Sequence, residues 1–151
     1  MKNIFHIGYH KTASTWFQKR FYPFVENLSN VSREDIKSYF YYKRAVNFPM
    51  NSDLVFCDEE LSGNIHNAGL SGFLQDNIAK EISQFNNPKV IVFIRNQYDI
   101  IISSYLQYIK EGGTYSLRKY LYHKDFDRPH RNPLFSYKHF DYHSIITTYI
   151  D

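Results

Sequence analysis

A lysine and several hydroxyl side chains gather in one short stretch near the start of the chain, Ile7–Trp16. Its turn, Tyr9–Ser14, lies between a strand-like run and a helix-like run, where backbone N–H groups lack helical partners. Such groups attract anions, and Lys11 adds a positive charge. Three short side chains carry hydroxyl donors: Thr12, Ser14 and Thr15. With Ala13, small enough to admit a phosphate, this turn (the Lys11 loop) predicts a phosphate site.

The Lys11 loop does not have the Walker A pattern. That pattern needs two glycines with four residues between them, the second directly before the lysine, whereas only Gly8 is present here and Lys11 comes early. The usual Mg²⁺-binding arrangement is therefore not predicted. An ordinary strand–turn–helix, capped by Ser14 or Thr15, is the alternative interpretation.

A second candidate phosphate site combines Arg95 with Ser103. Arg95 follows the apolar run Lys89–Ile94, and ligands of open α/β sheets bind at the carboxyl ends of strands. Ser103 falls in the second turn of the helix expected next, within reach of a guanidinium, so the two side chains can hold one phosphate. The alternatives are a surface ion pair of Arg95 with Asp99 and a plain helical serine.

Three consecutive acids, Asp58, Glu59 and Glu60, follow the short apolar run Leu54–Cys57. That run has the character of a buried strand, so the acids are expected at the same sheet edge as both phosphate motifs. A carboxylate can take a proton from a hydroxyl held about 2.6–3.2 Å away. A solvated acidic loop is the alternative.

The elements that must position these side chains alternate along the chain. Strands are predicted at Asn3–Gly8, Leu54–Cys57 and Lys89–Ile94. The last is a continuous β-branched run, typical of the middle of a parallel sheet covered on both faces. Helices are predicted at Thr15–Phe21, Ala68–Phe85, Asn96–Lys110, Tyr115–Tyr122 and Phe140–Ile150, with loops at Asn27–Asp35 and His123–Asn132. This order predicts an α/β fold in three layers, a mostly parallel central sheet flanked by helices, as a single domain over residues 1–151.

Composition narrows the class of protein. The chain has 151 residues and a net charge of +3, too weakly basic to indicate nucleic-acid binding. Its single cysteine, Cys57, excludes an intrachain disulfide, and no apolar stretch is long enough for a membrane span. We therefore expect a cytoplasmic protein. The 14 Tyr and 13 Phe indicate either biased composition or an aromatic-lined site, and the seven His form no metal-binding pattern.

In three places the chain resembles sulfotransferases that use 3'-phosphoadenylyl sulfate (PAPS), especially bacterial carbohydrate-type members. His10–Thr15 is similar to their 5'-phosphosulfate loop, with Ala13 in place of a common glycine. Arg95 and Ser103 have the spacing of their 3'-phosphate motif, with Gln97 where proline is usual. Asp58–Ser62 matches their acidic motif if Glu59 is the base, with Asp58 replacing a serine. The three places span Ile4–Tyr105.

The resemblance implies a P-loop-like fold and transfer of a sulfuryl group from PAPS to a hydroxyl, with adenosine 3',5'-bisphosphate (PAP) as product and no metal. It implies that Glu59, or as second choice Glu60, accepts the hydroxyl proton, and that Lys11 stabilises the charge on the leaving group. It favours a carbohydrate acceptor. The nucleotide-binding residues that it implies are Lys11, Thr12, Ala13, Ser14, Thr15, Trp16, Arg95 and Ser103.

Two other functions stay open. A nucleotide kinase or NTPase with a degenerate loop would need Mg²⁺ and a metal-binding aspartate, for which Asp58 is the candidate. A non-catalytic nucleotide-binding module is the other. Domains of the resembling family continue well beyond this length, so we expect the chain to be truncated at its C-terminus, and an exposed apolar face there would favour homo-oligomers.

Overall fold

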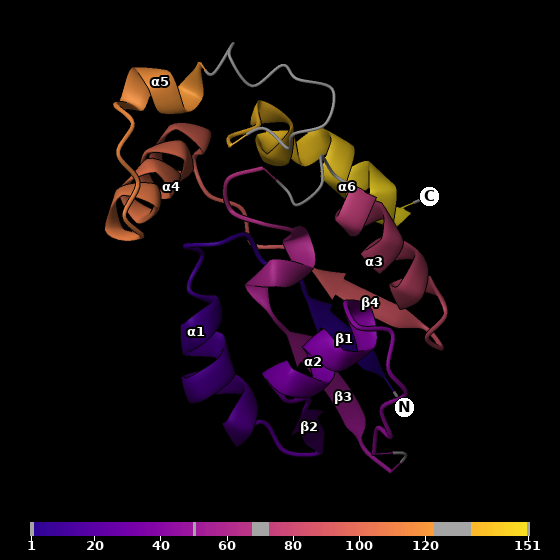
Figure 1. Ribbon diagram of the computed structural model, residues 1–151. Coiled ribbons are helices and arrows are strands. Elements are labelled where there is room, and N and C mark those ends of the chain that lie inside the picture. Colours follow the sequence, from indigo (N-terminus) through magenta and orange to yellow (C-terminus); the bar gives the residue numbers. More distant parts are fainter. Residues whose placement is uncertain (1, 50, 68–72, 123–133, 151) are drawn as a thin grey trace.

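The computed structural model describes residues 2–49, 51–67, 73–122 and 134–150, and in residues 73–75 the backbone alone. Its centre is a four-stranded parallel sheet in the order β2-β3-β1-β4 (Figure 1). The strands are β1 (Asn3–His6), β2 (Leu28–Asn30), β3 (Asp53–Cys57) and β4 (Pro88–Ile91). The predicted α/β fold with a parallel central sheet flanked by helices is confirmed.

The described residues contain six α-helices and several short helical turns. The α-helices are α1 (Ser14–Trp16), α2 (Arg33–Phe40), α3 (Phe73–Ser83), α4 (Gln97–Lys110), α5 (Leu117–Leu121) and α6 (Tyr142–Ile150). A π-helical turn, Phe17–Phe21, and a 3-10 turn, Tyr22–Phe24, continue α1, and two further 3-10 turns cover Glu59–Ser62 and Tyr137–Phe140.

Strand register brings the functional segments to one edge of the sheet. His6 at the end of β1 pairs with Cys57 of β3 on one side and with Ile91 of β4 on the other. The segments that follow these three strands therefore leave the sheet at a common carboxyl edge. They contain the Lys11 loop, the acids after β3, and Arg95.

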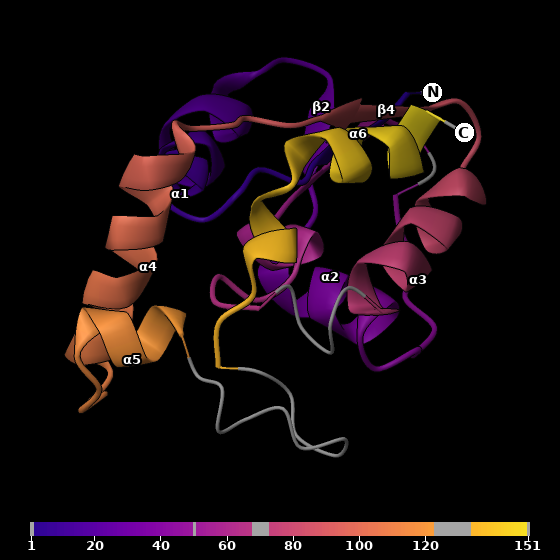
Figure 2. The ribbon, with the colours of Figure 1, turned by 90° about the horizontal axis from the view of Figure 1, so that it is seen from above.

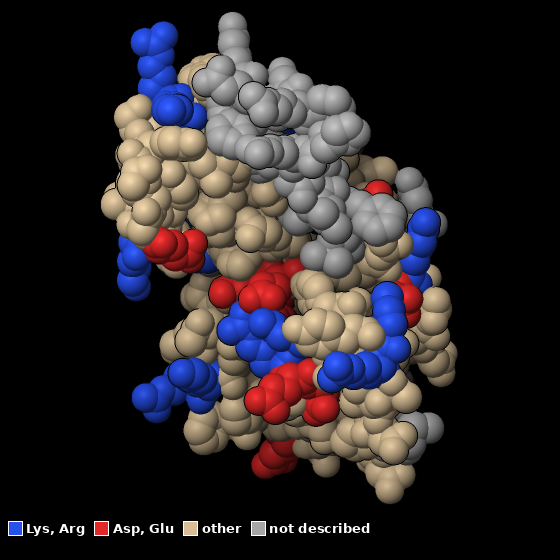
Figure 3. Space-filling view, in the orientation of Figure 1, with Lys and Arg blue, Asp and Glu red and all other residues tan. Residues whose placement is uncertain are grey.

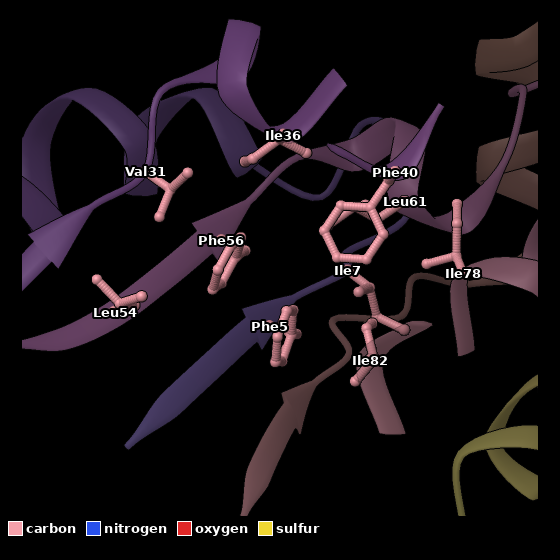
Figure 4. Packing of buried hydrophobic residues seen from close by; sticks show 10 residues of the cluster. All are labelled: Phe5, Ile7, Val31, Ile36, Phe40, Leu54, Phe56, Leu61, Ile78 and Ile82. Atoms are coloured by element: carbon pink, nitrogen blue, oxygen red, sulfur yellow. The ribbon is translucent and has the colours of Figure 1, made fainter. Parts of the chain in front are cut away.

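Successive side chains of a strand point to opposite faces of the sheet, so the core is divided between the two faces. Phe5 and Phe56 stack at 4.6 Å on one face, where residues of α2 and α3 cover them (Figure 4). On the other face Val55 and Cys57 pack against Tyr22 from the segment that begins with α1. Burial there raises the pKa of the Cys57 thiol to about 12. Layers on both sides of the sheet therefore enclose β1 and β3.

Beyond the carboxyl edge a second apolar cluster joins the loop after β1 to the later helices. Tyr9 packs there with Ile100 of α4, Tyr120 of α5 and Ile145 of α6. Figures 1 and 2 show α4 and α5 standing off the sheet, to one side of the layers. This cluster fixes α4 beside the Lys11 loop.

Several element predictions need correction. The run predicted as a central strand forms β4, which lies at the edge of the described sheet, pairs with β1 alone among the described strands, and ends at Ile91 rather than Ile94. Its β-branched residues are half-buried by α3 and α6 rather than enclosed by further strands. The Asn27–Asp35 stretch, expected to be a loop, supplies β2 and the start of α2.

Other boundaries differ by a few residues. The helix predicted to begin at Thr15 is α-helical for only three residues before its π turn. The final helix begins at Tyr142, after a 3-10 turn, rather than at Phe140. The first residues of the helix predicted at Ala68–Phe85 and the loop predicted at His123–Asn132 lie outside the described residues. No helix within the described ranges is long and apolar enough to cross a membrane.

Candidate functional site

A pocket of about 730 Å³ opens at the carboxyl edge of the sheet. Six of the residues singled out from the sequence line it: Lys11, Ala13, Ser14, Thr15, Glu59 and Arg95. They come from the segments after β1, β3 and β4, so three stretches that are distant in the chain meet here. Glu60, the second choice for a base, also lines the pocket.

The Lys11 loop has an unusual backbone. Lys11 and Ala13 both have positive φ values, 64° and 66°, a left-handed conformation that costs non-glycine residues on the order of 1 kcal/mol. The Thr12 hydroxyl donates to the carbonyl of Tyr9, so it braces the loop and does not line the pocket. Within the described part of the chain, the N–H groups of Ser14 and Thr15 have no acceptor. These donors sit beside the pocket.

Gly8 is required by the packing beneath this loop. A Cβ at this position would lie 2.9 Å from Nε2 of His6 and 3.1 Å from the Thr12 hydroxyl oxygen. Since the His6 ring is fully buried, it has little room to move away. The single glycine of the motif therefore permits the close approach of the loop to β1.

Lys11 reaches across the pocket to α4. Its ammonium donates to Oε1 of Gln107 at 3.0 Å. Gln107 in turn donates to the Glu111 carboxylate, four residues further along the helix, at 2.6 Å. Gln107 of α4 and Glu111, which directly follows α4, both line the pocket, so the end of α4 forms part of its wall.

Glu59 is the best-connected acid in the pocket. Ser14 Oγ donates to its Oε2 at 2.6 Å, and Nδ1 of His10 lies 3.6 Å from its Oε1. His10 and then the Ser14 hydroxyl lower the pKa of Glu59 to about 2, against the opposing effect of its partial burial. Glu59 is therefore an ionised carboxylate facing the pocket.

His10 is held in one orientation. Its Nε2 lies 2.9 Å from the carbonyl oxygen of Gly63, and because a carbonyl only accepts, Nε2 must carry the proton. Nδ1 then faces Glu59, and an attraction between the two requires a second proton on the ring. His10 therefore lies between the Gly63 carbonyl and the Glu59 carboxylate.

The acids that flank Glu59 are held away from the centre of the pocket. Asp58 is 1% exposed, accepts from the N–H of Glu60, and pairs with Nε of Arg33 at 3.0 Å. Burial raises the pKa of Asp58 in spite of these donors. Glu60 pairs with Arg33 at 2.7 Å and with Lys37 of α2 at 3.3 Å. Glu59 has no Lys or Arg partner among the described residues, so the geometry favours Glu59 over Glu60 as the carboxylate that a ligand can reach.

Arg95 lies on the exposed link between β4 and α4. Its backbone carbonyl accepts from the Tyr142 hydroxyl at 2.7 Å, which ties this link to α6. Its side chain lines the pocket and has no ion-pair partner among the described residues. The expected alternative pairing with Asp99 does not form.

Ser103 and Trp16 are placed differently from the other candidates. Ser103 is half-buried and is not a lining residue, although it lies one helical turn before Gln107 on the same side of α4. The adjacent Ser104 is fully buried. Trp16 is 52% exposed on the outside of α1 and also does not line the pocket.

A buried polar cluster supports the α4 wall. Nδ1 of His66 lies 2.8 Å from the Tyr120 hydroxyl and 3.0 Å from Oγ of Ser104. Its Nε2 faces the Glu111 carboxylate at 3.6 Å. Burial lowers the pKa of His66, and the nearby Glu111 opposes that effect. The neutral ring, with its proton on Nε2, therefore links α5 and α4 to the pocket.

Sequence reasoning missed several lining residues, among them Asn64, His66, Gln107 and Glu111. Gln107 and Glu111 had a signal, because they follow Ser103 at four-residue intervals on one helix face. His66 had no such signal in the sequence, since only the fold of the segment after β3 brings it to the pocket. Among the described residues, no group of three or more His, Cys, Asp or Glu could hold a metal ion.

Comparison of the chain with protein-family models, with curated proteins and with solved structures found no match. The geometry of the pocket therefore carries the functional proposal.

Proposed function

We propose that this protein is a PAPS-dependent sulfotransferase whose acceptor is a hydroxyl, most suitably that of a carbohydrate. The observation that carries the proposal is the meeting of Lys11, Glu59 and Arg95 in one pocket at the carboxyl edge of a parallel sheet. A bisphosphate nucleotide needs two cationic positions, and the transfer needs a carboxylate between donor and acceptor. The pocket offers this combination from three separate segments.

In the proposed reaction the acceptor oxygen attacks the sulfur of PAPS, and the bond from sulfur to the 5'-phosphate oxygen breaks. The acceptor proton passes to Glu59, and PAP leaves with its new charge beside Lys11. Preorganised donors at that position stabilise the transition state more than the ground state. Free N–H groups at Ser14 and Thr15 are suited to the same oxygen atoms.

The Ser14–Glu59 hydrogen bond gives the proposed mechanism an order of events. A carboxylate with a pKa of about 2 is a weak base. When the 5'-phosphosulfate occupies the loop, Ser14 Oγ donates to it instead and releases Oε2 of Glu59. Nucleotide binding then raises the basicity of Glu59 before the acceptor enters.

Arg95 is assigned to the 3'-phosphate, because it is a lining cation without a described carboxylate partner. Ser103 can join it only where the nucleotide extends along α4 past Gln107. Thr12 and Ala13 are assigned lesser roles in nucleotide binding: Thr12 shapes the loop, and Ala13 lets the phosphate approach. Trp16 does not line the pocket and is assigned no role in nucleotide binding.

The kinase alternative is less well supported by Asp58. Its two carboxylate oxygens are occupied by the Glu60 N–H and the Arg33 side chain, at 2.9 and 3.0 Å. A metal ligand would have to give up one of these buried contacts. The non-catalytic alternative shares the nucleotide site and differs only in turnover.

Calorimetric titration tests the proposal. PAP should bind, 5'-AMP and Mg-ATP should bind at least tenfold more weakly, and Arg95→Ala should weaken PAP binding by about 100-fold, since a charge-assisted contact is worth roughly 1.5–3 kcal/mol. Arg118→Ala, an exposed arginine on α5, is the matched control. Preferential binding of Mg-ATP would replace the proposal with the kinase alternative.

A transfer assay then separates an enzyme from a binding module. It measures sulfuryl transfer from radiolabelled PAPS to candidate sugars.

A further inference from the structure

A row of large aromatic side chains lies exposed on the helical segment Ser14–Val25, outside the pocket. Trp16, Phe21 and Phe24 are 52%, 43% and 76% exposed. Large exposed apolar patches are uncommon on monomers and mark binding to a partner or a membrane. These three residues are called the Trp16 patch below.

The π-helical turn builds this patch. Because a π turn bonds residues five apart, it brings Trp16 and Phe21 over one another, with their rings stacked at 6.1 Å. Phe17 lies beneath them and stacks on Phe93 from the β4–α4 link at 4.9 Å. The patch is therefore anchored to the sheet and preformed.

Cations outnumber acids around the patch. The segment Ser14–Val25 contains Lys19 and Arg20, and one exposed acid, Glu26, directly follows it. Both cations are exposed, and neither forms an ion pair with a carboxylate of the described residues. Figure 3 shows blue side chains projecting at the left edge, beside the segment that begins with α1 in Figure 1.

We propose that the Trp16 patch docks the protein on an anionic lipid surface, with the rings entering the headgroup region and Lys19 and Arg20 contacting lipid phosphates. Exposed Trp and Phe with adjacent unpaired cations match the chemistry of interfacial helices. A second copy of the chain fits less well, because a two-fold contact through the patch would bring together two cations from each copy and only one acid, Glu26, from each. This inference is independent of the proposed activity.

Docking also gives the pocket a fixed position relative to the lipid. Thr15 lines the pocket, and the patch begins at the next residue, Trp16. A surface in contact with the patch therefore lies close to one lining residue of the pocket.

Trp16 makes the test specific, because it is the only tryptophan of the chain. Its emission is followed while the full chain is titrated with vesicles of phosphatidylcholine, either alone or mixed with phosphatidylglycerol. We expect a blue shift and co-sedimentation with the anionic vesicles only. No response to them, or an equal response to the neutral ones, would overturn the proposal.

Two sets of variants locate the contact. Lys19→Gln with Arg20→Gln should weaken anionic-vesicle binding about 30-fold, since each cation near such a surface contributes roughly fivefold. Phe24→Ser should weaken it without altering the circular dichroism. Tyr42→Ser and Arg118→Gln, at exposed positions elsewhere, should leave it unchanged. A blue shift that grows with protein concentration in the absence of lipid would instead assign the patch to self-association.

Discussion

The hydroxyl of Ser14 donates to the carboxylate of Glu59 at 2.6 Å, and this contact joins the loop after β1 to the turn after β3. A hydrogen bond at the edge of the sheet thereby connects two residues that are 45 positions apart in the chain. After His10, this contact is the next largest cause that lowers the pKa of Glu59. In the proposed reaction, its loss on nucleotide binding makes the base available.

The first prediction concerns acid stability. The folded pKa of Glu59, about 2, is lower than the ordinary glutamate value of 4.5. Its stabilising contribution is thus complete above pH 4.5 and is lost as the pH falls towards 2, on the order of 3 kcal/mol in total. Urea unfolding of Glu59→Gln should show a smaller decline across this window than the parent chain. An identical decline in both proteins would contradict the assigned pKa.

Ser14→Ala tests the same contact from the other side. Removal of the donor should move the pKa of Glu59 upwards, observable by titrating the Glu59 carboxyl signal by NMR. The stability lost should be about 1.5–3 kcal/mol, typical of a hydrogen bond to a charged group. Thr15→Ala, which removes a neighbouring hydroxyl, is the control and should leave the Glu59 titration in place.

A second pH window arises from His139. This side chain is 1% exposed among aromatic rings, and burial lowers its pKa from 6.5 to about 3. Because the unfolded chain binds a proton that the folded chain excludes, stability falls as the pH drops from 6.5 towards 3. His139→Phe should flatten this part of the stability profile, measured as the free energy of unfolding from pH 7 to 4. The exposed His143→Gln should not.

Ala13→Gly should stabilise the protein, contrary to the usual effect of glycine. Ala13 has a φ of 66°, where glycine avoids a cost of roughly 1 kcal/mol or more, and only part of this gain is offset by the greater freedom of unfolded glycine. Ala79→Gly, inside α3, should instead destabilise by about 0.5–1 kcal/mol. Thermal unfolding of both variants measures these two changes in stability. If both variants are less stable than the parent chain, the left-handed conformation of Ala13 is contradicted.

The two adjacent serines of α4 should behave differently. Ser104 is fully buried against Tyr120 at 2.6 Å, so Ser104→Ala should cost about 1–3 kcal/mol of stability. Ser103→Ala should change stability by less than about 0.5 kcal/mol and, under the proposed function, weaken PAP binding. Unaltered PAP affinity in Ser103→Ala would remove this residue from the 3'-phosphate site.

Much of the site followed from local patterns. Lys11, Glu59 and Arg95 each come soon after an apolar run, and parallel strands necessarily bring such positions to one edge. The elements that were not predicted from the sequence also have local causes. β2 is three residues long and largely polar, so it has no apolar run to mark it, although Ser32 and Asp35 already carried the capping signal of α2.

The position of β4 at the sheet edge could not be read from its β-branched residues. A run of Val and Ile indicates burial, and here α3 and α6 supply it in place of neighbouring strands. His66 and Glu111 are brought together by the packing of α4 and α5 on the segment after β3, a long-range relationship without a periodic signature.

The burial of Cys57 has a practical consequence for experiments on this protein. The thiol is 3% exposed and its pKa is about 12, so at neutral pH it carries almost no reactive thiolate. A cysteine introduced on the surface would therefore be the single site for a fluorescent or spin label. The rate at which Cys57 itself becomes modified would report how often the layer that begins with α1 lifts from the sheet.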